Sequence, residues 1–135
     1  MNRIANGHSI MIPIPAGGCQ SGGYMGSSTV AQPGQVINVG NDLVGVPEGS
    51  YAPGTAGNMT LLLDGAYGNM LLNTGDTPIV GDKLYVNTTP VTINDITYPG
   101  VLTTTAGDNV FAGWCYSLPV VGATYTTVGL LLKKG

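Results

Sequence analysis

Few side chains in this chain are of the types that enzymes use for catalysis, and they are far apart. His8 is the single histidine, and Cys19 and Cys115 are the two cysteines. Nucleophilic catalysis needs a base oriented beside the nucleophile, and no second imidazole is present to supply one. A zinc site needs three or four ligands, and these residues lack the spacing typical of such sites. The sequence therefore predicts no catalytic residue, no metal site and no enzymatic activity.

The remaining polar residues favour structural roles. Each of six aspartates stands beside glycine or asparagine, where its carboxylate is expected to bond the local backbone in a turn; they are Asp42, Asp64, Asp76, Asp82, Asp95 and Asp108. No loop combines enough of them for a typical calcium motif. The glycine-rich segment 16–34 lacks a phosphate-binding motif and is expected to be a loop, so no cofactor is predicted. Two buried free thiols are expected, although spacing alone leaves a disulfide open.

Charge is sparse and slightly negative. Asp, Glu, Lys and Arg make up 8% of the residues and the net charge is −3, whereas a typical soluble domain has about 25% charged residues. Four scattered cations cannot neutralise a run of phosphates, so nucleic acid is not expected as a partner. No apolar stretch is long enough to span a membrane, and prolines interrupt the short apolar run near the N-terminus, which makes a signal peptide a poor interpretation. Assembly in a cytoplasm is therefore expected.

Glycine and proline determine the expected secondary structure. The 22 glycines and 9 prolines are spread evenly, so a helix of three turns would contain at least one of them wherever it was placed. Strands of four to eight residues fit between these breakers. The expected strands cover residues 9–15, 35–40, 42–46, 58–64, 66–72, 79–87, 91–97, 100–105, 109–117 and 124–132. This pattern predicts an all-β fold, either a jelly-roll-like β-sandwich or a small β-barrel.

The chain is expected to form one domain over residues 10–135, preceded by an N-terminal arm over residues 1–9. Residues 9–15 place Ile10, Ile12 and Ile14 on one face, and their two prolines predict an edge strand or an extended arm. Trp114 lies in an alternating apolar strand and is expected in the core. The seven tyrosines are spread along the chain and are suited to serve as interface anchors.

Several segments, taken in order, resemble a known family. They are PAGGCQSG at 15–22, DLVGVP at 42–47, VGDKLYVN at 80–87, FAGWCYSLP at 111–119 and TVGLLLKKG at 127–135. Their order is similar to that in the small capsid decoration or cement proteins of tailed bacteriophages. The block Val80–Tyr85 is the most specific piece, and the order and spacing of all the pieces carry the resemblance.

The resemblance implies a structural virion protein with an all-β fold and no enzymatic activity. Its implied partners are the assembled major capsid protein, on the outer capsid surface, and a second or third copy of itself. Edge pairing by the N-terminal arm is one expected contact with a neighbouring chain. The candidate contact residues are Ile4, Ile10, Met11, Ile12, Tyr24 and Tyr51.

The main alternative is a carbohydrate- or receptor-binding β-module of a phage fibre or cell surface. That alternative predicts exposed aromatic side chains gathered in one groove. The sequence leaves open the symmetry axis occupied, the choice between dimer and trimer, the host, and the division of contacts between capsid and self-association.

Overall fold

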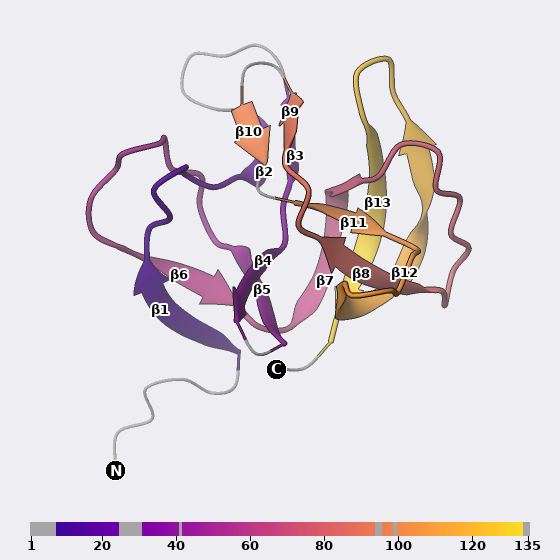
Figure 1. Cartoon of the computed structure of the whole chain (residues 1–135), viewed down its shortest axis with the longest axis horizontal. Coiled ribbons are helices and arrows are strands. Elements are labelled where there is room, and N and C mark those ends of the chain that lie inside the picture. Colours follow the sequence, from indigo (N-terminus) through magenta and orange to yellow (C-terminus); the bar gives the residue numbers. More distant parts are fainter. Residues whose placement is uncertain (1–7, 25–30, 41, 94–95, 99, 134–135) are drawn as a thin grey trace.

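The prediction of an all-β fold is confirmed. A computed structural model describes residues 8–24, 31–40, 42–93, 96–98 and 100–133, and its regular elements within these ranges are strands. The strands form a small closed barrel, a four-stranded curved sheet beside it and two short hairpins (Figure 1). Among the described residues, we found no helix with the length and hydrophobicity needed to cross a membrane.

Five strands close into the barrel in the order β11-β8-β12-β13-β7. They are β7 (Gly65–Leu72), β8 (Lys83–Asn87), β11 (Val101–Thr103), β12 (Val110–Val121) and β13 (Thr126–Leu132). The closing contact pairs Leu102 of β11 with Leu72 of β7 in parallel, and the Asn73 N–H donates to the Leu102 carbonyl at 2.7 Å. Closure leaves no free edge on β7 and β11 where they pair.

The largest core cluster among the described residues lies mainly inside the barrel and extends to Val36, Val44 and Val46 beside it. Leu72, Leu84, Leu102 and Leu130 are almost fully buried in it, and Cys115 belongs to the same cluster. Alternating inward positions of the five strands supply these side chains, as expected for a small barrel filled by its own residues.

Truncation at the barrel seam is expected to be costly. Leu102→Ala removes a buried side chain from the one described ladder pairing between β11 and β7. We expect the free energy of unfolding to fall by about 2–5 kcal/mol, because the cavity cannot collapse where two strands close a barrel. Urea denaturation measures this change. Leu131→Ala, on the exposed outer side of β13, is the matched control and should cost less than about 1 kcal/mol.

The second sheet has the order β1-β6-β5-β4. Its strands are β1 (Ser9–Pro13), β6 (Asn58–Leu62), β5 (Leu43–Pro47) and β4 (Ile37–Gly40). As predicted, β1 is an edge strand, since β6 is its only partner among the strands that the structure describes. The three alternating isoleucines of segment 9–15 also share one face as predicted, since Ile10, Ile12 and Ile14 pack on the cluster formed by Cys19, Met59, Leu61 and Leu63.

Two hairpins correct the strand predictions. Part of the predicted loop 16–34 forms β2 (Ser21–Tyr24) and β3 (Ala31–Gly34). These residues have low strand propensity, and pairing of Gly34 with Met70 of β7 holds β3 in place. The single strand predicted at 91–97 is instead an antiparallel pair, β9 (Val91–Ile93) and β10 (Ile96–Tyr98), which alternation cannot distinguish from one strand.

The dipeptide Asp64-Gly65, of a type common in hairpin turns, does not form a hairpin here. β6 before this dipeptide pairs with β1 and β5, while β7 after it belongs to the barrel. The dipeptide therefore carries the chain from one sheet to the other. Gly65 has a φ of 109°, a conformation that glycine adopts without strain.

A third core cluster joins the β9–β10 hairpin to the barrel around Tyr98, which is fully buried. The Tyr98 hydroxyl donates to the Pro33 carbonyl at 2.8 Å and so also ties β10 to β3. Burial of the phenol, with a smaller contribution from neighbouring Tyr125, raises the pKa of Tyr98 well above its usual value.

Stability is therefore expected to decline in alkali. An unfolded tyrosine ionises near pH 10, whereas folded Tyr98 stays neutral, so its contribution is complete below about pH 10 and is lost as the pH rises further. The expected slope is up to about 1.4 kcal/mol per pH unit for this one proton. Urea denaturation between pH 8 and 11.5 measures it, and Tyr98→Phe should show a shallower slope. Equal slopes in the two proteins would contradict this assignment.

Candidate functional site

The residues with potential chemistry do not form a reactive centre. His8 is an exposed side chain that pairs with Asp64. Cys19 and Cys115 are free and buried in different core clusters, which confirms the expectation of free thiols. Burial raises the pKa of both thiols, so they are protonated and weakly nucleophilic. Among the described residues, no three His, Cys, Asp or Glu side chains are placed to hold a metal ion.

Two of the aspartates organise loops, as predicted from their neighbours. Asp82 accepts a hydrogen bond from the Ile79 N–H at 3.0 Å and closes its own turn. Asp76 accepts from the Thr103 hydroxyl at 2.8 Å and from the Thr104 N–H at 3.0 Å, which fixes the loop after β7 against the end of β11. These carboxylates therefore have structural partners.

The core position predicted for Trp114 is wrong. Trp114 is 37% exposed, while the next residue, Cys115, is buried. The register of β12 against β8 shifts by one residue between Phe111 and Gly113, which is the signature of a β-bulge. Up to the bulge an even-numbered residue, Ala112, faces the core. Beyond the bulge an odd-numbered residue, Cys115, faces the core, and Trp114 therefore points outward.

Gly113 makes this bulge possible. A Cβ built on Gly113 would lie 2.0 Å from the Leu131 carbonyl oxygen of β13, far closer than any contact allows. Gly113 pairs with Leu132 of β13 and Leu84 of β8 and is therefore held between two strands. The absence of a side chain at this position thus determines which side chains of β12 reach the surface.

The surface outward of the bulge is apolar over a large area. We call it the β12 surface, and its exposed members are Ile79, Val80, Trp114, Tyr116, Leu118, Val120, Val121 and Leu131. Each leaves on the order of 100 Å² in contact with water, about 800 Å² when both sides of the strand are added, which is comparable to the share of one partner in a standard protein interface.

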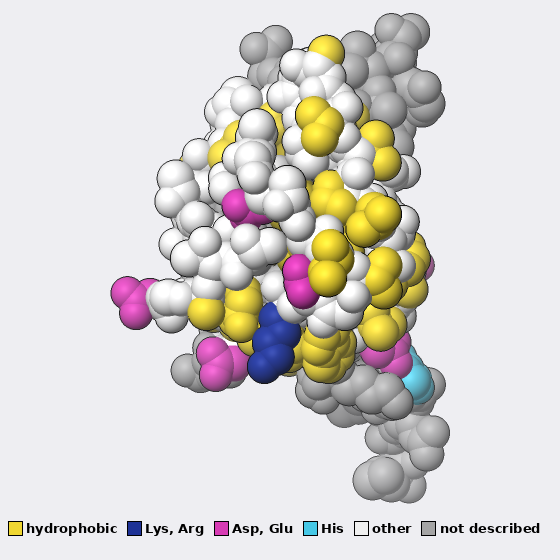
Figure 2. Space-filling model, turned by 90° about the vertical axis from the view of Figure 1, so that its right-hand side faces the viewer, with side chains coloured by type: hydrophobic (Ala, Val, Ile, Leu, Met, Phe, Trp, Pro, Cys, Tyr) yellow, Lys and Arg dark blue, Asp and Glu magenta, His cyan; other side chains and the backbone are white. Residues whose placement is uncertain are grey.

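Backbone pairing brings these residues together. Trp114 stands opposite Leu131 in the β12–β13 ladder. The Gly81 N–H donates to the Cys115 carbonyl at 2.7 Å, which places the segment with Ile79 and Val80 beside β12. Figure 2 shows hydrophobic side chains spread over this side of the molecule, with few charged groups among them.

The outer end of β12 is an open strand edge. β8 pairs with β12 only as far as Trp114, and β13 occupies the other side up to Val121. Val120 and Val121 are consecutive and both exposed, so both sides of the strand are accessible there. Pro119 lacks an N–H, and the ladder is irregular between Ser117 and Val120, features that discourage unspecific strand addition.

An aromatic cluster borders the β12 surface. Phe111 packs edge-to-face on Trp114, with ring centres 5.2 Å apart, and on Tyr85 at 5.8 Å. The amino groups of Lys83 and Lys133 lie 5.8 and 5.7 Å from the centre of the Phe111 ring, within cation–π range. The cluster combines partly exposed rings with two cations.

The contact residues predicted from the sequence lie on the other sheet or outside the description. Ile10, Ile12 and Tyr51 are half-buried and pack on the second core cluster, while Met11 points outward and is 69% exposed. Ile4 and the side chain of Tyr24 lie outside the described residues. The β12 surface was not predicted from the sequence. One feature pointed to it: the apolar run Leu118–Val121 contains a proline, which indicates an exposed strand edge.

Comparisons with known proteins give no relative. No protein-family model matches the chain, no curated protein matches it, and no solved structure matches its fold. Inference about function rests on the residues and surfaces of this chain.

Proposed function

We propose that this protein is a structural virion protein that binds the outer surface of an assembled phage capsid and cements adjacent major capsid protein subunits. The observation that carries the proposal is the β12 surface, an exposed apolar area of the size that one partner gives to a stable protein interface. The order of the sequence motifs is similar to that in the capsid decoration proteins, and this similarity supports the capsid as the partner. No catalytic role is proposed for any residue.

The distribution of buried and exposed residues supports a binding role for this surface. The barrel core is filled by side chains that point inward from all five strands, so the outward residues of β12 are not needed to complete it. Exposed Leu118, Val120 and Val121 therefore gain burial only from a partner. The sparse charge of the chain lowers the desolvation cost of such a contact.

Cementing follows from linkage. A protein that binds the assembled lattice but not free subunits stabilises the lattice by mass action. Two or three linked copies, as in the homo-oligomer that we propose, add avidity when they contact several capsid subunits at once. Met11 on the open edge of β1 is a second exposed apolar side chain suited to a contact between neighbours.

The test is stabilisation of heads. Purified protein added to undecorated, DNA-filled phage heads is expected to raise the temperature at which the heads release DNA, in proportion to occupancy. A DNA-binding dye measures the release. Heads that bind the protein to saturation and still release DNA at the unchanged temperature would contradict the cementing role.

The aromatic cluster favours one other function, a carbohydrate-binding module. Partly exposed Trp114, Phe111 and Tyr85 offer rings against which sugars stack. Trp114 is the single tryptophan, so its fluorescence reports directly on this site. A saturable change of emission with a glycan, abolished in Phe111→Ala, would favour this module; unchanged emission across a glycan panel would favour the capsid proposal.

A further inference from the structure

Both lysines in the described part of the chain lie beside the start of β12. Lys83 stands opposite Trp114 in the β8–β12 ladder. On the other side of β12, the Lys133 N–H donates to the Ala112 carbonyl at 2.9 Å. The two amino groups lie over the same Phe111 ring, at 5.8 and 5.7 Å from its centre. We call this site the Phe111 corner, and it consists of Lys83, Tyr85, Phe111, Trp114 and Lys133.

Neither lysine has a carboxylate partner among the described residues, where the single ion pair joins His8 to Asp64. Asp82, which precedes Lys83 in the chain, bonds the Ile79 N–H of its own turn. Two ammonium groups held over one ring repel each other, and the cation–π attraction at an exposed site is modest. An anion that contacts both groups would offset this repulsion and gain charge-assisted hydrogen bonds.

Aromatic and apolar side chains surround the two amino groups. Trp114 is partly exposed and packs edge-to-face on Phe111, and exposed Leu131 stands opposite Trp114 in the β12–β13 ladder. Figure 2 shows positively charged atoms bordered by hydrophobic side chains on this side of the molecule. A free inorganic anion would leave these rings in water, whereas a carboxylate beside apolar groups would let them be covered as well. The corner therefore favours an acidic group that has apolar neighbours.

Positive charge marks one end of the β12 surface only. Trp114 belongs to both the Phe111 corner and the β12 surface, so the two are continuous. The far end of β12, with Leu118 and Val120, receives no lysine or arginine from the described residues. A partner that covers the whole surface therefore meets cations at one end and hydrocarbon at the other, which fixes its orientation.

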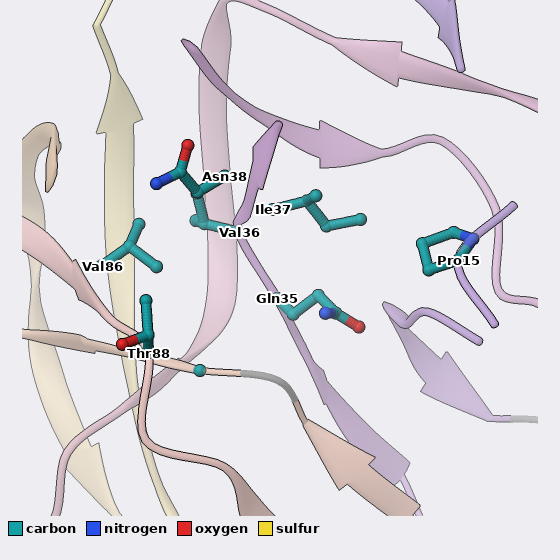
Figure 3. Close-up of a pocket in the computed structure, with 8 residues that line it drawn as sticks. Pro15, Gln35, Val36, Ile37, Asn38, Val86 and Thr88 are labelled. Atoms are coloured by element: carbon teal, nitrogen blue, oxygen red, sulfur yellow. The ribbon is translucent and has the colours of Figure 1, made fainter. Parts of the chain in front are cut away.

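A pocket of about 300 Å³ between the four-stranded sheet and the barrel has a different character (Figure 3). Ile37 of β4 and Val86 of β8 are among its lining residues, none of which is charged or aromatic. Nothing in this lining selects an ionic partner. Selection of an acidic partner is thus a property of the Phe111 corner and not of this pocket.

We propose that the Phe111 corner receives an acidic segment of the protein partner, with a carboxylate contacting Lys83 and Lys133 and an apolar side chain against Trp114. This inference rests on the proposed function, because it names the chemistry of the capsid segment that meets one end of the β12 surface. Charges at the rim of an interface act mainly on the association rate and on its salt dependence. Since the net charge of the chain is −3, the corner directs an acidic partner that the rest of the molecule repels.

The association rate with immobilised, expanded phage heads tests the proposal. We expect an increase in NaCl from about 20 to about 300 mM to slow association of the unmodified protein about tenfold. Lys83→Gln with Lys133→Gln should remove most of this salt dependence, whereas Lys83→Arg with Lys133→Arg should retain it. Ala56→Glu with Thr89→Glu lowers the net charge by the same two units at exposed positions outside the corner, and should slow association less than about twofold.

A peptide probe separates this inference from the capsid function. A peptide of alternating glutamate and leucine should shift the indole N–H signal of Trp114 in NMR spectra of the full chain at low salt. It should bind about fivefold more tightly than its glutamine–leucine counterpart, and the variant with both lysines changed to glutamine should lose this preference. A response to the acidic peptide without any binding to heads would contradict the capsid function and support the preference for an acidic segment.

Three results would overturn the proposal. The first is binding to heads at a rate that depends neither on salt nor on the two lysines, which would leave the capsid function intact. The second is equal affinity for the two peptides. The third is a shift of the Trp114 signal by an acidic oligosaccharide, such as a polygalacturonate fragment, but not by the acidic peptide, which would assign the corner to an anionic sugar.

Discussion

Replacing Leu118 and Val120 together with lysine is expected to lower the affinity for phage heads by at least about 100-fold. These side chains are 59% and 65% exposed at the open end of β12, so the free protein tolerates lysine there. In a complex the two ammonium groups would be desolvated without partners, which costs more than the roughly 2.7 kcal/mol that corresponds to 100-fold. Quantitative co-sedimentation with heads measures the loss.

The comparison variant places one lysine, in place of two, on the other sheet. Met11→Lys is at a site of similar exposure on β1. Circular dichroism and urea denaturation should show both proteins folded with nearly unchanged stability. If the β12 variant binds heads as well as the unmodified protein, the β12 surface is not the contact. If Met11→Lys alone abolishes binding, the contact runs through the N-terminal edge strand.

Gly113→Ala is expected to destabilise the protein by about 3–5 kcal/mol, the largest effect of any single methyl group that we predict. The new Cβ would lie 2.0 Å from the Leu131 carbonyl oxygen. Relief requires either separation of β12 from β13 or loss of the bulge, and loss of the bulge would turn Trp114 inward and Cys115 outward. Urea denaturation gives the free energy, and the emission maximum of Trp114 reports a change of face.

Gly17→Ala is the control for this prediction. A Cβ on Gly17 meets no atom within 4 Å, so the substitution should be neutral or slightly stabilising. A Gly113→Ala protein as stable as the unmodified chain would show that β12 and β13 separate at little cost. The bulge would then not be what sets the β12 surface.

Much of the fold was predictable because glycine and proline limit where strands can run. Segment 58–64 was expected as a strand and contains β6, and the isoleucines of segment 9–15 face the core as their spacing required. The two prolines of that segment correctly indicated an edge. These features depend on local sterics and on a period of two, which a single sequence displays.

What the sequence hid were features set by distant partners. Ser21–Tyr24 contains two glycines, which have low strand propensity, and is a strand through its pairing with β3. The bulge at Gly113 adds one residue to β12 and so shifts which side chains face the core. The alternation of apolar residues around Trp114 in the sequence does not indicate whether such a bulge is present. The β12 surface was missed partly for this reason, since Trp114 was expected in the core, and partly because the strand was expected to end at residue 117, before Leu118, Val120 and Val121.

The central claim is that this protein binds an assembled capsid lattice, and co-sedimentation with undecorated phage heads tests it most directly. Purified protein is titrated against expanded and unexpanded heads, and the bound amount is measured per major capsid subunit. We expect saturable binding to expanded heads at a fixed ratio to capsid subunits. Absence of binding to both forms would contradict it, and the glycan panel read through Trp114 would then become the leading experiment.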